Sequence, residues 1–154
     1  MLTDNQVFFR LILSVVLSGF MGLERQYKHR TAGLRTHILV SLGSCLIMLT
    51  SLYVFDIYYK IASLDPSRIA AGVITGIGFL GAGAILRDKE RITGLTTAAS
   101  LWVVAGIGLA VGCGFIKAAI CTTALGLLVL FSLRSLEVRL FGKEEKIESQ
   151  KGGG

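Results

Sequence analysis

The segment that most constrains the fold of this chain covers residues 69–86. It contains 18 residues, none of them charged, and five of them are glycine. A helix of this length spans about 27 Å, enough to cross the hydrocarbon core of a bilayer. In a water-exposed helix each interior glycine costs about 0.8–1 kcal/mol relative to alanine. In lipid, small residues instead let helices pack closely. The segment therefore predicts a helix inside a membrane bundle.

Composition extends this prediction to the whole chain. Hydrophobic residues make up 53% of it and charged residues only 17%, compared with about 25% in soluble domains. Apolar windows fall at about residues 7–23, 34–55, 69–86, 95–111 and 115–133. We therefore expect an all-α, polytopic integral membrane protein. Residues 1–133 would form a bundle of five transmembrane helices, and residues 134–154 a short basic cytoplasmic tail.

The distribution of basic residues predicts the orientation of these spans. In a five-span arrangement, twelve of the 16 Lys and Arg residues fall on one side and four on the other. Cytoplasmic loops carry the excess of positive charge. The N-terminus is then outside and the C-terminus inside. Although the net charge is +6, the basic residues lie between apolar runs, so we expect no nucleic-acid partner.

Small residues recur at helical spacing and predict where the helices pack. The third span carries them on two roughly opposite faces, so we place it at the centre of the bundle. An alternative interpretation has the same glycines lining a permeation path. The predicted packing positions are Ser14, Ser18, Gly22, Gly72, Gly76, Gly78, Gly83, Ala99, Gly106 and Ala110.

Several polar residues should meet at the cytoplasmic side, where the second and fourth spans begin and the first and third end. Helix N-termini there favour negative charge. The hypothesis is a polar pocket for an anion or an acidic partner group, with Glu24 pairing Arg35 when it is empty. In the alternative, the threonines cap helices and the arginines anchor to headgroups. The candidate residues are Glu24, Arg25, Arg35, Thr36, His37, Arg87, Thr96, Thr97 and Ser100.

Metal ligands and catalytic groups are sparse. Asp56 and Asp65 could contact a hydrated Mg²⁺, but Asp65 precedes Pro66 and is better explained as a helix cap. The five windows contain no Asp or Glu, unlike the intramembrane acidic sites of many cation carriers. No nucleophile–base pair stands out. We expect no metal site, no cofactor and no enzymatic activity.

Four segments resemble the membrane domain of the MgtC/SapB family. They are GLER at 22–25, AGLRTH at 32–37, GIGFLGAG at 76–83 and GLTTAASLW at 94–102. The resemblance covers roughly residues 10–133. It implies a multi-pass protein of the bacterial inner membrane, linked to growth at low magnesium and to survival inside host cells. Many family members carry a further cytoplasmic domain, which residues 134–154 are too short to form.

Two functions are compatible with these features. The first is a regulatory protein that binds another membrane protein and thereby affects ion or energy homeostasis. The second is a small oligomeric transporter or channel with a polar cytoplasmic entrance. Self-association is expected in both, because small-residue faces favour helix–helix contacts.

Overall fold

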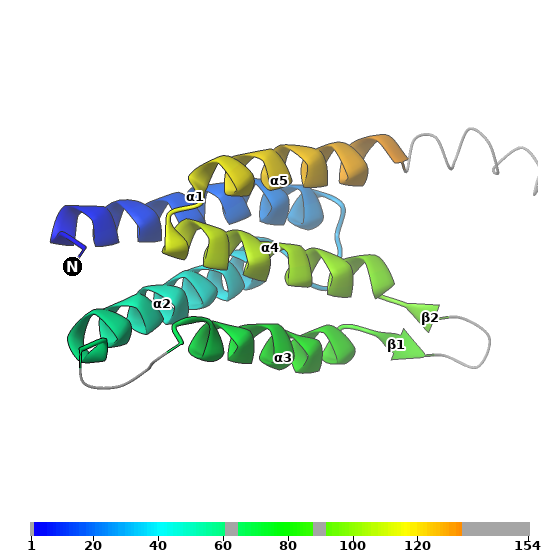
Figure 1. The fold of residues 1–154 in the computed structure, drawn as a ribbon. Helices are drawn as coiled ribbons and strands as arrows, with labels where there is room; N and C mark the ends of the chain where they lie inside the picture. Colours follow the sequence, from blue (N-terminus) through cyan, green and yellow to red (C-terminus); the bar gives the residue numbers. More distant parts are fainter. Residues whose placement is uncertain (1, 61–64, 88–91, 134–154) are drawn as a thin grey trace, which may run out of the picture.

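The computed structural model describes residues 2–60, 65–87 and 92–133, and it is mostly helical (Figure 1). The helices are α1 (Asp4–Tyr27), α2 (Leu34–Tyr58), α3 (Ser67–Gly83), α4 (Leu95–Cys113) and α5 (Ile116–Leu128), which continues into a π-helical turn, η1 (Val129–Leu133). Helices α1, α2 and α4 are long and apolar enough to cross a membrane, whereas α3 and α5 are shorter apolar helices.

Each predicted span coincides with a helix, but the all-α expectation missed one element. A short antiparallel hairpin, β1 (Leu86–Arg87) and β2 (Ile92–Thr93), connects α3 to α4. For this reason α3 ends at Gly83 rather than at the predicted residue 86. Strands of two residues are too short to show an alternating pattern. The predicted tail, 134–154, lies outside the described residues.

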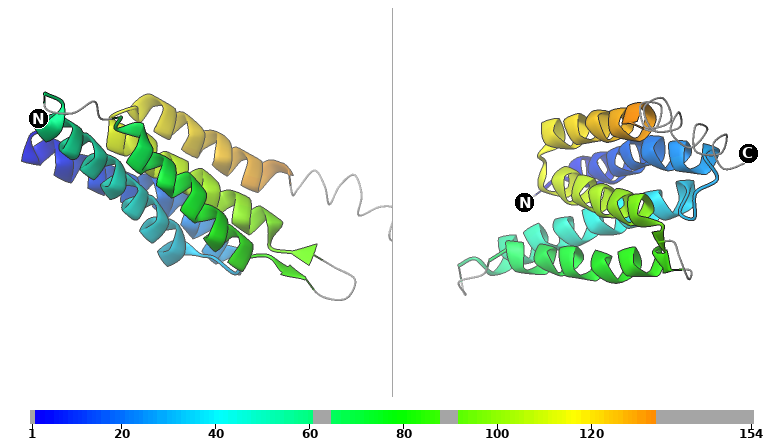
Figure 2. Two further views of the ribbon diagram at one scale, coloured as in Figure 1. Left: turned by 60° about the horizontal axis from the view of Figure 1, so that its bottom comes forward. Right: turned by 90° about the vertical axis from the view of Figure 1, so that its right-hand side faces the viewer.

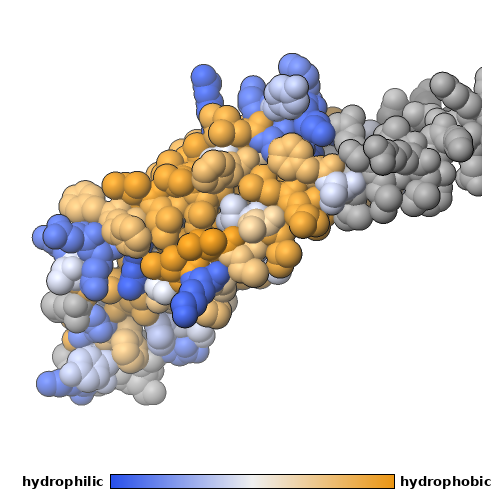
Figure 3. Space-filling view, turned by 90° about the horizontal axis from the view of Figure 1, so that it is seen from above, coloured by the Kyte–Doolittle hydropathy of each residue, from blue (hydrophilic) through white to orange (hydrophobic). Residues whose placement is uncertain are grey.

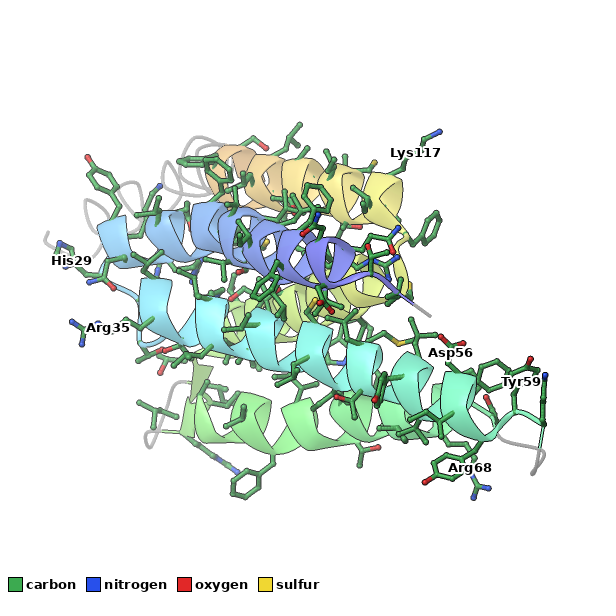
Figure 4. The ribbon with its side chains drawn as sticks, turned by 90° about the vertical axis from the view of Figure 1, so that its left-hand side faces the viewer. His29, Arg35, Asp56, Tyr59, Arg68 and Lys117 are labelled. Carbon is green, nitrogen blue, oxygen red and sulfur yellow. The ribbon has the colours of Figure 1, made fainter. Side chains whose placement is uncertain are left out.

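Successive helices run in opposite directions, so the connections alternate between the two ends of the bundle (Figure 1). We call the end that holds the α1–α2 connection and the hairpin the basic end. His29 and Arg35 lie there, whereas Asp56, Tyr59, Arg68 and Lys117 lie at the opposite end (Figure 4). Between the ends, the face seen in Figure 3 is dominated by apolar side chains, and hydrophilic residues gather toward its ends.

The central helix is α4, which packs against the other four helices, whereas α3 packs mainly against α2 and α4. Helices α3 and α5 lie at opposite edges (Figure 2). The prediction that the third span is central is therefore wrong for the single chain. Both faces of α3 carry small residues, but only Ile77 and Gly81 in this helix are buried. Small side chains permit close packing on a face without requiring a neighbour in the same chain.

Helices α2 and α4 approach each other closely at Gly108 and Gly112. A Cβ at Gly108 would overlap the carbonyl oxygen of Ser41 and lie 2.8 Å from the Cβ of Ser44. A Cβ at Gly112 would lie 2.7 Å from the Cβ of Met48. These glycines form a GxxxG motif, which brings helix backbones together.

Some of the predicted packing positions are buried in the structure, and others have no described residue packed on them. Ser14 and Ser18 are fully buried, and Gly22 packs on the start of α2. Ala110 is partly buried against the core, whereas Ala99 is exposed. A Cβ would meet nothing within 4 Å at the five remaining positions, Gly72, Gly76, Gly78, Gly83 and Gly106.

Left-handed glycines set both ends of α4. Gly94 and Gly114 each have φ of 90°, a conformation that favours glycine. At the second of these turns, Arg10 Nη1 donates a 2.7 Å hydrogen bond to the carbonyl of Gly112. The side chain thereby satisfies a carbonyl at the C-terminus of α4 and ties α1 to the α4–α5 turn.

Candidate functional site

Five polar residues are buried together at the basic end, and we call them the buried polar cluster. Glu24 and Arg25 come from the last turns of α1, His37 from the first turn of α2, and Thr97 and Ser100 from the start of α4. None of the five is more than 5% exposed. Three helix ends thus bring two opposite charges and an imidazole into the interior.

Arg25 connects α1 to α4 within this cluster. Its Nη1 lies 3.6 Å from Glu24 Oε2, and its Nη2 donates a long hydrogen bond of 3.5 Å to Thr97 Oγ1. Glu24 Oε2 accepts no hydrogen bond from any described residue. The carboxylate therefore depends on the nearby guanidinium for its electrostatic compensation.

His37 connects α2 to α4. Its Nδ1 donates to the carbonyl of Gly33 at 2.8 Å, and its Nε2 is hydrogen-bonded to Ser100 Oγ at 3.0 Å. Ser100 Oγ also lies 2.8 Å from the carbonyl oxygen of Thr97. Both ring nitrogens are thus occupied, which fixes the orientation of the imidazole.

Gly22 allows the cluster to assemble. A Cβ at Gly22 would lie 2.8 Å from Leu34 Cα and 3.1 Å from His37 Cβ. A Cβ at Gly33 would overlap only the end of the Gln26 side chain, which can rotate away. Because Gly22 lacks a side chain, the end of α1 and the beginning of α2 approach closely enough to bury His37.

The other four predicted members of the pocket are exposed. Arg35 and Thr36 lie in the first turn of α2, Arg87 in β1 and Thr96 in the first turn of α4. Glu24 pairs with Arg25, so the predicted pair with Arg35 is wrong. The sequence indicated which helix ends meet, but the rotation of each helix decides which side chain points inward.

We expect burial to separate the two predicted threonines chemically. In a cysteine-free background, Thr36→Cys should react with a membrane-impermeant maleimide at least about tenfold faster than Thr97→Cys. Thr97 is only 3% exposed, so its reaction requires local opening, and each 1.4 kcal/mol of opening free energy slows labelling about tenfold. The measurement is the labelling rate of each variant in membranes. Equal rates would show that the N-terminus of α4 is open to water.

The two aspartates considered for magnesium lie outside the cluster. Asp65 Oδ1 accepts a 2.8 Å hydrogen bond from the backbone N–H of Ser67, as expected for a cap of α3. Asp56 lies near the end of α2. Within residues 2–60, 65–87 and 92–133, no group of three or more His, Cys, Asp or Glu side chains is placed to hold a metal ion.

The cap predicts a pH dependence for the start of α3. Hydrogen bonds from Ser67 hold the pKa of Asp65 below its ordinary value of 3.8. A lowered folded-state pKa adds stability above the unfolded-state pKa, and this stability is lost as pH falls through the folded-state value. We expect the protection of the first-turn amides of α3 against hydrogen exchange, measured relative to an unstructured amide at the same pH, to fall below about pH 4. Asp65→Asn should remove this loss of protection at low pH. If the pH dependence of protection were unchanged in Asp65→Asn, the Asp65 cap would not be its cause.

Sequence reasoning missed the interior polar residues of α2. Ser41 is fully buried, and its Oγ donates to the carbonyl of Ser14 at 3.4 Å. Ser44 is 3% exposed and lies against Gly108 of α4. The GxxxG motif at 108–112 was the available signal, because a close helix contact requires small residues on the opposing helix as well.

The long apolar helices, the apolar exterior and the polar cluster at one end are the features of a helical membrane protein. The sequence profile of the MgtC family matches residues 11–139, and this chain belongs to that family. No solved structure matches the chain.

Curated relatives agree with this assignment. The chain is 44% identical to the Escherichia coli (strain K12) protein named "Putative magnesium transporter YhiD", over 93% of this chain and 67% of that protein. It is 40% identical to protein SapB of Bacillus subtilis, over 87% and 56% of the two chains. It is 38% identical to protein MgtC of Salmonella paratyphi A, over 92% and 58%. The chain thus spans little more than half the length of SapB and MgtC.

Proposed function

We propose that this chain is a non-enzymatic, multi-pass protein of the bacterial inner membrane that acts by binding another integral membrane protein. All five helices would cross the bilayer, with the basic end in the cytoplasm. The binding would regulate magnesium-linked ion or energy homeostasis. The magnesium link is supported by membership of the MgtC family and by the name of the relative YhiD.

The observation that carries the proposal is the exposed outer face of α3. Ala71, Thr75, Gly78 and Ala82 share one side of this helix at a spacing of three and four residues, and all four are exposed. A Cβ at Gly78 would meet nothing within 4 Å. In a bilayer, small residues at this spacing are typical of helix–helix interfaces.

A matched pair of substitutions tests this binding face. The protein is purified from membranes in mild detergent, and integral proteins that co-purify in constant ratio are identified. Ala82→Leu, on the outer face of α3, should abolish recovery of such a partner. Ala124→Leu, at an exposed alanine on α5, should leave recovery unchanged. Recovery of the bare protein from the unsubstituted chain would refute the proposal.

The proposed orientation is tested separately. In a cysteine-free background, Arg30→Cys at the basic end should be labelled by an impermeant reagent only from the cytoplasmic side. Tyr59→Cys, at the opposite end, should be labelled only from outside. Labelling of Arg30→Cys in intact cells would invert the arrangement.

Transport is the second candidate function, because a relative at 44% identity carries the name of a magnesium transporter. Proteoliposomes that contain only this protein should then take up Mg²⁺ along a gradient. Absence of flux into vesicles with verified, folded protein would remove this candidate.

A further inference from the structure

An apolar groove runs between α2 and α3 on the outside of the bundle, apart from the buried polar cluster. Its volume is about 760 Å³, within the range of about 300–1,000 Å³ found for small-molecule sites. Helix α2 contributes Leu39, Gly43 and Ile47 to its lining, and α3 contributes Ile69, Gly72 and Gly76.

Glycines keep this groove open. A Cβ at Gly43, Gly72 or Gly76 would meet nothing within 4 Å, so no described side chain fills the space above them. The floor is formed in part by Ile77, which is buried against α4. Because the walls are apolar, the groove suits a hydrocarbon chain better than water.

Polar groups occur at one mouth of the groove. Arg35 and Thr36 line it, and both are exposed. Arg35 forms no ion pair with a described residue. Its side chain projects from the first turn of α2 at the basic end (Figure 4). The groove therefore combines an apolar body with an arginine at its mouth that pairs with no residue described by the structure.

The length of the groove matches one leaflet. The helical rise from Arg35 to Ile47 is about 18 Å, slightly more than half of a hydrocarbon core about 30 Å thick. An acyl chain that ends near the bilayer midplane therefore matches the length of the groove.

We propose that the α2–α3 groove binds an anionic phospholipid. One acyl chain lies along Gly43, Gly72 and Gly76, and the phosphate accepts hydrogen bonds from the Arg35 guanidinium and the Thr36 hydroxyl. Charge complementarity carries the choice of an anionic headgroup, because its net negative charge attracts the Arg35 guanidinium, whereas choline offsets the phosphate charge in a zwitterionic lipid. The inference uses the proposed membrane placement but not the proposed protein partner.

The test compares two substitutions on opposite sides of α3. Gly76→Leu fills the groove, whereas Gly78→Leu lies on the outer face, and neither new Cβ meets a neighbour within 4 Å. The full chain in neutral detergent is titrated with phosphatidylglycerol, and bound lipid is counted by native mass spectrometry. The unsubstituted protein and Gly78→Leu should each retain one lipid, and Gly76→Leu should bind at least about tenfold more weakly.

A second pair tests the headgroup. Arg35→Gln should lose about tenfold in affinity for phosphatidylglycerol. It should lose less for phosphatidylcholine, because the choline group already offsets the charge of the phosphate, so the preference for the anionic lipid should shrink. Arg30→Gln, also exposed at the basic end, should keep the preference. Glycerol phosphate should not displace the bound lipid, because the acyl chain supplies most of the contact.

Several results would overturn the proposal. They are unchanged lipid binding by Gly76→Leu, equal loss in Gly78→Leu, and displacement by glycerol phosphate. If Gly76→Leu lost a dimer but kept its bound lipid, the groove would be a contact with a second copy of this chain instead. If Gly76→Leu does not fold, Gly43→Leu, which fills the same groove from α2, replaces it in the test. Because the partner test uses Ala82→Leu and this test uses Gly76→Leu, either proposal can fail without the other.

Discussion

Gly108→Ala should lower the free energy of unfolding by about 3 kcal/mol, near the upper end of the usual cost of overpacking a core. The new methyl group would overlap the carbonyl oxygen of Ser41 and crowd Ser44 Cβ. A backbone carbonyl cannot rotate away as a side chain can, so α2 and α4 must separate. The measurement is reversible unfolding in mixed micelles of mild detergent and dodecyl sulfate.

Gly106→Ala provides the matched control on the same helix. A Cβ at Gly106 would meet nothing within 4 Å, so we expect stability to be unchanged or raised by up to about 1 kcal/mol. Cys45, which is fully buried beside the same contact, gives an independent readout. Its thiol should become reactive in Gly108→Ala but not in Gly106→Ala. Equal stability of the two variants would mean that α2 and α4 do not pack as described.

Arg25→Gln should lower the free energy of unfolding by about 3–5 kcal/mol, the cost of removing one partner from a buried ion pair. Glu24 is 5% exposed, and its Oε2 accepts no hydrogen bond from any residue that the structure describes. Without the guanidinium the buried carboxylate would lose its compensating charge. Arg30→Gln, an exposed position at the same end, should change stability by less than about 0.5 kcal/mol.

The double variant Glu24→Gln/Arg25→Gln separates charge pairing from packing. If the charges compensate each other, the double variant should lose less stability than the sum of the two single variants, with a coupling of about 1–3 kcal/mol. Additive losses would show that Arg25 acts through its other contacts. The same micelle unfolding assay measures all three variants.

The sequence predicts which helix ends form the buried polar cluster, but not which of their residues point inward, because that depends on how each helix is rotated about its axis. The motifs GLER, AGLRTH and GLTTAASLW place polar residues at the ends of three helices, and these ends do meet. Their order along the chain does not say which residues face inward. Arg25 and Arg35 look alike in the sequence, yet one is buried and the other is exposed. The difference arises because the close contact at Gly22 fixes how α1 and α2 are rotated.

By itself, the sequence determined the approximate bounds of the helices in the part of the chain that the structure describes, because apolar runs of this length must form hydrogen-bonded helices when little polar surface is available. It also determined the membership of the MgtC family, through motifs that belong to single segments. Only the tertiary structure decided that α4 is central, that α3 lies at an edge, and that a groove opens beside Gly72 and Gly76. A glycine reads the same in the sequence whether a neighbouring helix packs on it or none does, because the contact depends on residues far apart in the chain.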